Sequence, residues 1–124
     1  MKRYDLKAMN AEAVSGAYYR KAIFGDSLSV ARVEVSRGEA TLPHSHSTEE
    51  MIFVLKGCWR FSLPDGDVEL REDQLLCIPA GVVHSSEALE DTVALDICSQ
   101  HRADWMSGQD KPLHENPEQF LWGV

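Results

Sequence analysis

The chain has 124 residues, enough for one compact domain with a sizeable core and too few for two. It carries 20 acidic and 12 basic side chains, which give a formal net charge of −8. A surface with this charge repels phosphate groups, and the basic residues form no dense cluster. We therefore expect neither a nucleic-acid partner nor a membrane-surface partner.

The location and redox state of the protein are indicated by what the sequence lacks. No apolar stretch has the length of a transmembrane helix, and the first residues, MKRYDLKAMNAEAV, lack the apolar core of a secretory signal. A cytoplasmic protein is therefore expected. Cys58, Cys77 and Cys98 are odd in number, lie in apolar runs and have no CxxC spacing, so we expect reduced, buried thiols.

Most of the chain has the pattern of short β-strands. Residues 1–16 are mixed in composition and end in SGA, so we expect a lead-in with little regular structure. From residue 17 onward, turn residues separate runs rich in β-branched and aromatic residues: AYYRKAIF, LSVARVEVS, MIFVLKG, CWRFSLPDGDVEL, QLLCIPAG, VVHSSEAL and TVALDICS. Residues 30–36 alternate with period two, and Asp65–Gly66 supplies a hairpin turn. The pattern predicts an all-β sandwich or barrel.

The carboxyl-terminal residues differ from this pattern. Residues 99–110, SQHRADWMSGQD, predict a helical turn that ends before Gly108 and Pro112. The polar segment that follows ends in the apolar pentapeptide FLWGV, which we expect to dock on the barrel or on a partner subunit. We interpret residues 1–124 as one domain, with a barrel core at about 28–98 and an extension over 99–124.

Two histidines precede the run MIFVLKG. His44 and His46 are two residues apart, so in an extended segment both side chains leave from the same face. Two imidazoles aimed at one point suggest a metal site. Glu49 and Glu50 both follow closely, and spacing alone does not choose between them as a further ligand. A third histidine, His84, stands at the start of a later β run.

These residues resemble the two motifs of the cupin superfamily. The first motif matches at every specified position, namely Gly38, His44, His46, Glu50 and Gly57. The second motif matches at Pro79, Gly81 and His84, with Asp73 where the family usually has glycine and Ala88 where it often has asparagine. Aspartate tolerates unusual dihedral angles, so Asp73 should preserve the loop. The resemblance covers roughly residues 28–97 and implies a double-stranded β-helix, the cupin jelly-roll barrel.

The resemblance also implies a metal centre. It makes His44, His46, Glu50 and His84 the ligands of one divalent transition metal per chain, and it leaves Glu49 as a solvated or outer carboxylate. Three neutral imidazoles and one carboxylate suit Fe, Mn, Ni, Co or Zn, and the sequence does not identify which. Coordination positions left open would allow catalysis. His101 and His114 lie outside both motifs and are interpreted as surface residues.

The segment LEDTVALDICSQHRADWMSG resembles the ending of small single-domain cupins of the pectin-degradation type, which are called KdgF-like. The matching residues are Asp96, Ser99, Arg102, Asp104 and Trp105, whereas Cys98 and Gln100 replace an aromatic residue and a proline. Those relatives convert a cyclic unsaturated uronate to its open-chain keto form. The resemblance implies that Asp96 moves a proton, that Arg102 holds the substrate carboxylate, and that Glu50 completes the catalytic centre.

Several functions remain open at this stage. The leading hypothesis is a metal-dependent enzyme that isomerises or tautomerises a sugar acid. The alternatives are an Fe(II) or Mn(II) dioxygenase, in which Glu50 also serves as a base, and a non-catalytic cupin that binds a small molecule. Asp96 and Arg102 also have structural interpretations, as a hydrogen bond to a loop and as an ion pair with Asp104 or Asp96. Related cupins are commonly dimers, so a homodimer is expected.

Overall fold

The computed structural model describes residues 1–99, and over this range its regular secondary structure is almost entirely β-strand. A short 3-10 turn, η1 (Leu6–Ala8), precedes the strands. The strands are β1 (Glu12–Ser15), β2 (Tyr18–Phe24), β3 (Ser29–Val35), β4 (Ala40–His44), β5 (Glu50–Lys56), β6 (Cys58–Leu63), β7 (Gly66–Arg71), β8 (Leu75–Ile78), β9 (His84–Ala88) and β10 (Thr92–Cys98). Within residues 1–99, no helix is long and apolar enough to cross a bilayer.

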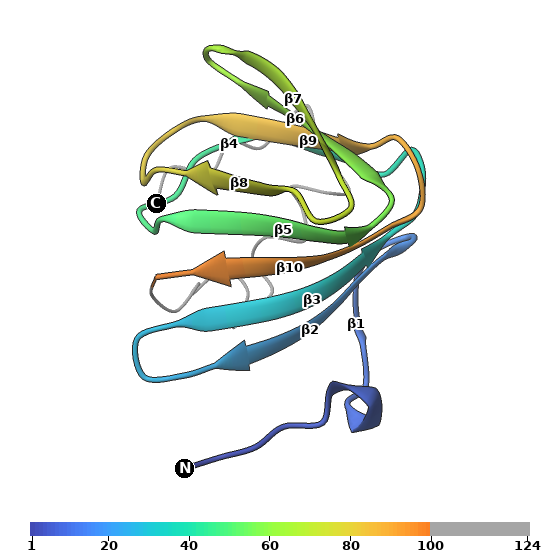
Figure 1. Cartoon of the computed structure of the whole chain (residues 1–124), viewed down its shortest axis with the longest axis vertical. Helices are drawn as coiled ribbons and strands as arrows, with labels where there is room; N and C mark the ends of the chain where they lie inside the picture. The colour runs from blue at the N-terminus through green and yellow to red at the C-terminus, as the bar shows by residue number, and fades with distance from the viewer. Residues whose placement is uncertain (100–124) are drawn as a thin grey trace.

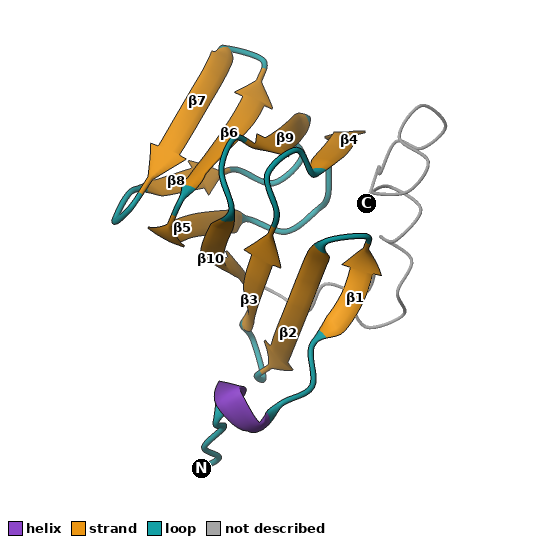
Figure 2. Ribbon diagram, turned by 90° about the vertical axis from the view of Figure 1, so that its right-hand side faces the viewer, coloured by secondary structure: helices purple, strands orange, loops and turns teal. Residues whose placement is uncertain are grey.

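The strands form two antiparallel sheets that face each other (Figures 1 and 2). The larger sheet has the order β1-β2-β3-β10-β5-β8, and the smaller has the order β4-β9-β6-β7. From β3 onward the chain crosses repeatedly between the two sheets, so β10 inserts between β3 and β5 although it is distant from both in sequence. This winding is that of a jelly roll and confirms the predicted all-β barrel.

The core lies between the sheets and follows the predicted alternation. In β3 the side chains of Ala31, Val33 and Val35 are buried, while the residues between them are partly or fully exposed. The same alternation holds along β10 and most of β5. Inward side chains from both sheets build one apolar cluster, which includes Val14, Val33, Ile52, Val54, Trp59, Phe61 and Ile78.

The expectation for residues 1–16 is wrong in part, because residues 12–15 form β1. This strand pairs with β2 through a turn at Gly16, with a register shift between Ala13 and Ser15. It is too short to show a period in the sequence. Tertiary contacts hold it instead: Val14 is only 1% exposed, and Glu12 makes a 2.7 Å ion pair with the buried Arg20.

The expectation of three buried thiols is also wrong in part. Cys58 and Cys98 are buried, whereas Cys77 is exposed, and no disulfide joins them. Cys77 lies on β8, an edge strand of the larger sheet, between Leu76 and Ile78. Because successive side chains of a strand point to opposite faces, burial of Ile78 turns Cys77 outward. Because Cys77 stands in an apolar run of the sequence, composition alone did not indicate that its side chain is exposed.

Several turns of the barrel have backbone conformations with positive φ, among them those at Gly38, Gly57 and Asp73. Asp73, where cupins usually have glycine, has φ 64° and is the only residue other than glycine with positive φ in residues 1–99. Gly38 has φ 92°, and open space surrounds the position that a Cβ atom would take. Gly57 has φ 99° between β5 and β6, and a Cβ there would overlap the carbonyl oxygen of Asp91 and approach the Thr92 hydroxyl to 2.7 Å.

This difference predicts unequal effects for two matched substitutions. Gly38→Ala should cost about 1–2 kcal/mol of unfolding free energy, because only the backbone is strained. Gly57→Ala should cost about 3 kcal/mol or more, because steric overlap with β10 adds to the same strain. Urea denaturation of the two variants and the wild type measures both effects. Equal midpoints for the two variants would contradict the packing described at Gly57.

Candidate metal centre

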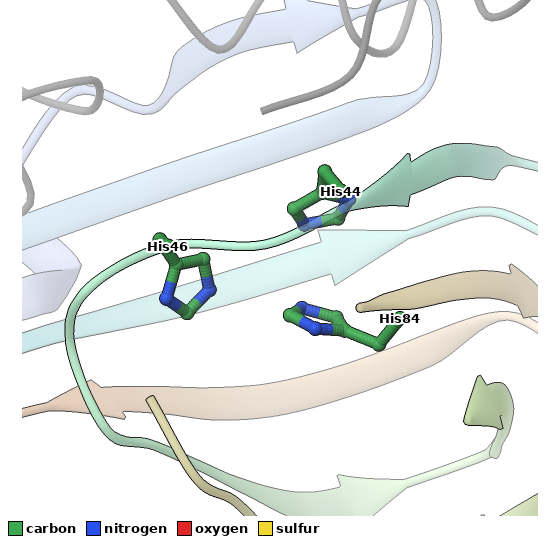
Figure 3. A group of neighbouring side chains, drawn as sticks. All are labelled: His44, His46 and His84. Carbon is green, nitrogen blue, oxygen red and sulfur yellow. The ribbon is translucent and has the colours of Figure 1, made fainter. Parts of the chain in front are cut away.

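Three buried histidines converge at one end of the barrel. His44 is the last residue of β4, and His84 is its cross-strand partner at the start of β9. His46 lies in the loop after β4, and one ring nitrogen of each histidine lies within 4.8 Å of the other two. Figure 3 shows the three rings turned toward one another. Their centroids are 4.4 Å apart for His44 and His84 and 5.2 Å apart for His46 and His84.

A backbone hydrogen bond connects the two loops that carry the sequence motifs. The turn after β8 contains Pro79 and Gly81, and Val82 N–H donates to the Pro79 carbonyl at 3.3 Å. Gly81 has φ 81°, which orients its N–H toward the other loop. That N–H donates to the carbonyl of His46 at 2.8 Å. The turn therefore sets the distance between His84 and His46.

Backbone carbonyls fix the orientation of each imidazole. In every ring Nδ1 lies within hydrogen-bond distance of a carbonyl oxygen two residues away: Leu42 at 2.6 Å from His44, Thr48 at 3.0 Å from His46, and Val82 at 2.9 Å from His84. A carbonyl oxygen only accepts, so each Nδ1 carries the proton and donates it. Each Nε2 then keeps its lone pair for a metal, which is the tautomer that metal-binding histidines use.

Glu50 completes the group of inward-facing donors. It is the first residue of β5 and is 4% exposed. Its Oε1 lies 3.1 Å from Nε2 of His46 and 3.3 Å from Nε2 of His84. Glu49, the neighbouring carboxylate, is exposed. The alternation of β5 thus separates the two glutamates that spacing alone could not distinguish.

This arrangement fits a metal ion. Carboxylate oxygens and unprotonated Nε2 atoms are all electron-pair donors, so their close approach is favourable only with a cation between them. A proton satisfies one such contact, whereas a metal ion satisfies all of them together. Adjacent ligands about 2.1 Å from a metal and at right angles to each other are about 3 Å apart. The separations of 3.1 and 3.3 Å around Glu50 are close to that value.

A second group of donors adjoins the first through Glu50. The carboxylates of Glu50 and Asp96 and the sulfur of Cys98 lie within 4.8 Å of one another, and all three residues are buried. On β10, Cys98 is the cross-strand partner of Glu50, and Asp96 is the cross-strand partner of Ile52; Glu50 and Ile52 both lie on β5. The structure therefore brings Asp96 beside Glu50. Arg102, His101, His114 and the expected helical turn and apolar terminus lie outside the described residues.

Sequence reasoning missed two features of this site. Cys98 is the buried core thiol that was expected, but its place beside Glu50 was not foreseen, because the register of β10 against β5 decides it. The role of Thr48 was also missed, since its carbonyl and its hydroxyl both approach Nδ1 of His46, at 3.0 and 3.1 Å. The register of distant strands has no local signal, but the serine–threonine pair between motif residues is a recognisable turn signal.

The electrostatic environment favours neutral histidine. Burial, and after it the neighbouring His84, lower the pKa of His44 to about 3, although the hydrogen bond to the Leu42 carbonyl raises this pKa. His44 is therefore neutral at physiological pH. A neutral imidazole can bind a metal without first losing a proton, so the site is prepared for its ligand role.

The fold and the histidine-rich donor groups together support a metal-binding barrel of the jelly-roll class. The family model of the cupin domain matches residues 31–98, which is more than half of the chain. The chain belongs to the cupin family, as its motifs predicted. A comparison with curated proteins finds none that matches the chain.

Solved structures of other cupins resemble this chain. KdgF from Halomonas sp. is 22% identical, with a TM-score of 0.78 over 84% of this chain and 99% of that chain. An RmlC-like cupin from Shewanella frigidimarina is 18% identical, with a TM-score of 0.74 over 80% and 90% of the two chains. Oxalate decarboxylase from Bacillus subtilis, which has Mn(II) centres, is 17% identical, with a TM-score of 0.70 over 78% of this chain and 29% of the enzyme. Identities this low show a shared fold.

The low pKa of His44 predicts how the stability of the metal-free protein depends on pH. Between pH 6.5, the ordinary pKa of histidine, and about pH 3, the unfolded chain binds a proton at His44 that the folded chain does not. The contribution of His44 is therefore complete above pH 6.5 and decreases as the pH falls, by up to about 1.4 kcal/mol per pH unit. Urea denaturation at pH 7, 6 and 5 measures this slope. His44→Gln should have a shallower slope, and equal slopes would contradict the assignment.

Proposed function

We propose that the protein is a metal-dependent enzyme that opens the ring of an unsaturated uronate, or a related sugar acid, and forms the open-chain keto acid. One observation carries the proposal: a buried carboxylate, Asp96, lies beside Glu50 on the inner face of the barrel, where Glu50 also approaches the histidines. The likeness of fold to KdgF and the match of Asp96 and Arg102 to the KdgF-like ending support the choice of substrate.

The metal would be held by His44, His46, His84 and Glu50. When bound, a divalent transition metal supplies Lewis acidity toward a substrate oxygen. The donor set is compatible with Fe, Mn, Ni, Co or Zn. The carbonyl groups that accept from Nδ1 hold the imidazole rings in place and increase their basicity. Ile78 is the cross-strand partner of Glu50 and Ile52 that of Asp96, and each is 1% exposed, so apolar side chains adjoin the carboxylates.

The proposed reaction transfers protons and changes no oxidation state overall. The hydroxyl group of the cyclic hemiacetal loses a proton as the ring C–O bond breaks, which leaves an aldehyde and an enol or enolate. A carbon atom of the enol then gains a proton, and its oxygen becomes a ketone. One carboxylate that accepts the first proton and returns the second is sufficient, and we assign this role to Asp96.

Substrate recognition requires a cationic group as well. Arg102 is the predicted partner of the substrate carboxylate, because a guanidinium group can donate two parallel hydrogen bonds to it. Cys98 occupies the position where KdgF-like proteins carry an aromatic residue. A smaller side chain at this position, which adjoins Glu50, changes the wall near the metal ligands, which is why a related sugar acid is included in the proposal.

The role of Asp96 can be tested with matched substitutions. Asp96→Asn should keep the fold and the metal but reduce turnover of a 4,5-unsaturated uronate by about 100-fold or more, because the amide cannot move the proton. Loss of the ultraviolet absorbance of the unsaturated acid measures turnover. Asp67→Asn, at an exposed position of β7, is the control and should retain the wild-type rate. Full activity of Asp96→Asn would refute its assigned role.

The same assay separates isomerisation from oxygenation. Turnover of the uronate should be equal in air and under nitrogen, since the proposed reaction consumes no oxygen. If the protein instead consumed oxygen with phenolic or enediol substrates and left the uronate unchanged, the dioxygenase alternative would replace the proposal. If neither substrate class reacted, a binding protein would be favoured.

A further inference from the structure

The second group of donors beside the candidate metal centre has the size of a cation site. The carboxylates of Glu50 and Asp96 and the sulfur of Cys98 lie within 4.8 Å of one another. The three residues are 4%, 6% and 0% exposed, so all of them are deeply buried. Oxygen and sulfur ligands stand about 2.0–2.3 Å from a zinc ion, so two ligands of one ion are at most about 4.6 Å apart. The three donors are therefore nearly close enough to share one cation, and small rotations of the side chains would complete the approach.

An unpartnered hydroxyl group faces the same three donors. Ser29, the first residue of β3, is 0% exposed, and its Oγ has no hydrogen-bond partner among residues 1–99. Ser29 is the cross-strand partner of Cys98, and Cys98 is that of Glu50. Directly paired side chains share one face and have Cβ atoms about 5 Å apart. The three residues thus form a row on the inner face of β3, β10 and β5, which lie side by side in Figure 1.

The chemistry of this group differs from that of the three histidines. The imidazoles are uncharged ligands, whereas two carboxylates and a thiolate are anionic ligands. Two buried carboxylates this close repel each other unless a proton or a cation lies between them. A sulfur ligand favours Zn²⁺ or Cd²⁺, which are called thiophilic cations, over Mg²⁺ or Ca²⁺. A buried polar atom such as Ser29 Oγ also costs free energy until it finds a partner.

We propose that Glu50, Asp96 and Cys98 bind a second divalent cation, of the thiophilic kind, when Zn²⁺ or Cd²⁺ is supplied in excess of the metal held by the histidines. Glu50 can serve both sites, because a carboxylate has two oxygen atoms. The Ser29 hydroxyl donates a hydrogen bond to the thiolate sulfur or to a water molecule on the cation. Two neighbouring cations repel each other, so this second site is the weaker one and fills only when the cation is in excess.

Occupation of this site has a consequence for catalysis. A cation on the Asp96 carboxylate uses the lone pair that would accept the substrate proton. Excess Zn²⁺ should therefore slow uronate turnover by the wild type, and it should slow turnover by Cys98→Ser less. This consequence rests on the proposed function, whereas the binding of the cation does not. Equal fractional inhibition of the two proteins would overturn the inhibitory role.

Titration of the full-length, metal-loaded protein with Cd²⁺ tests the site itself. A bond between cadmium and a thiolate produces an ultraviolet charge-transfer absorption, and elemental analysis after desalting counts the bound cations. The wild type should gain this absorption and one Cd²⁺ per chain while it keeps its first metal. Cys98→Ser should keep the first metal but lose the absorption, and Ser29→Ala should bind Cd²⁺ about tenfold more weakly. Cys77→Ser, which removes the exposed thiol, is the matched control and should bind Cd²⁺ as the wild type does.

Three results would overturn the second site. They are no absorption in the wild type, an equal absorption in Cys98→Ser, and Cd²⁺ that replaces the first metal one for one, because Cys98 would then belong to the first centre. Cadmium binding through Cys98 in a protein that turns over no uronate would support the site and contradict the proposed function alone. Circular dichroism reports whether each variant folds, and Cys98→Ala decides if Cys98→Ser does not fold.

Discussion

The site depends on one repeated interaction, the hydrogen bond from an imidazole Nδ1 to a backbone carbonyl two residues away. It occurs at His44, His46 and His84, with N···O distances between 2.6 and 3.0 Å. Each bond fixes a tautomer and directs an unprotonated Nε2 inward. The barrel contributes the rest: β4 and β9 pair His44 with His84, and the Gly81 turn anchors His46. Without these constraints, three buried imidazoles and a carboxylate would not approach one another.

The alternation of two central strands separates two kinds of surface. The inward residues of β5 and β10 include Glu50, Asp96 and Cys98, whereas the residues between them are apolar and face outward. The inward face of β5 changes along its length: Glu50 approaches His46 and His84, whereas Ile52 and Val54 belong to the apolar core. Burial of a carboxylate costs free energy unless a cation or a hydrogen-bond donor compensates it, and a bound metal ion would do so at Glu50.

Much of the fold was predictable because its signals are local. Period two along β3, the turn residues between strands, and the positive φ of Gly38, Gly57 and Asp73 follow from short segments of sequence. The histidine spacing was equally local. The second group of candidate ligands, Glu50, Asp96 and Cys98, could not be predicted from local signals, because the register of β10 against β5 brings Cys98 to Glu50. Strand β1 could not be predicted either, because pairing with β2 and burial of Val14 stabilise its four residues, rather than their intrinsic β-propensity.

The central claim is that the three inward Nε2 atoms and the Glu50 carboxylate bind one divalent metal ion. Elemental analysis of protein purified without added metal tests it most directly, with Glu49→Gln, Glu50→Gln and His44→Ala beside the wild type. The account predicts one transition-metal ion per chain in the wild type and in Glu49→Gln, because Glu49 is exposed. His44→Ala should lose the metal, and Glu50→Gln should bind it at least about tenfold more weakly. Equal metal content in the wild type and His44→Ala would contradict the account.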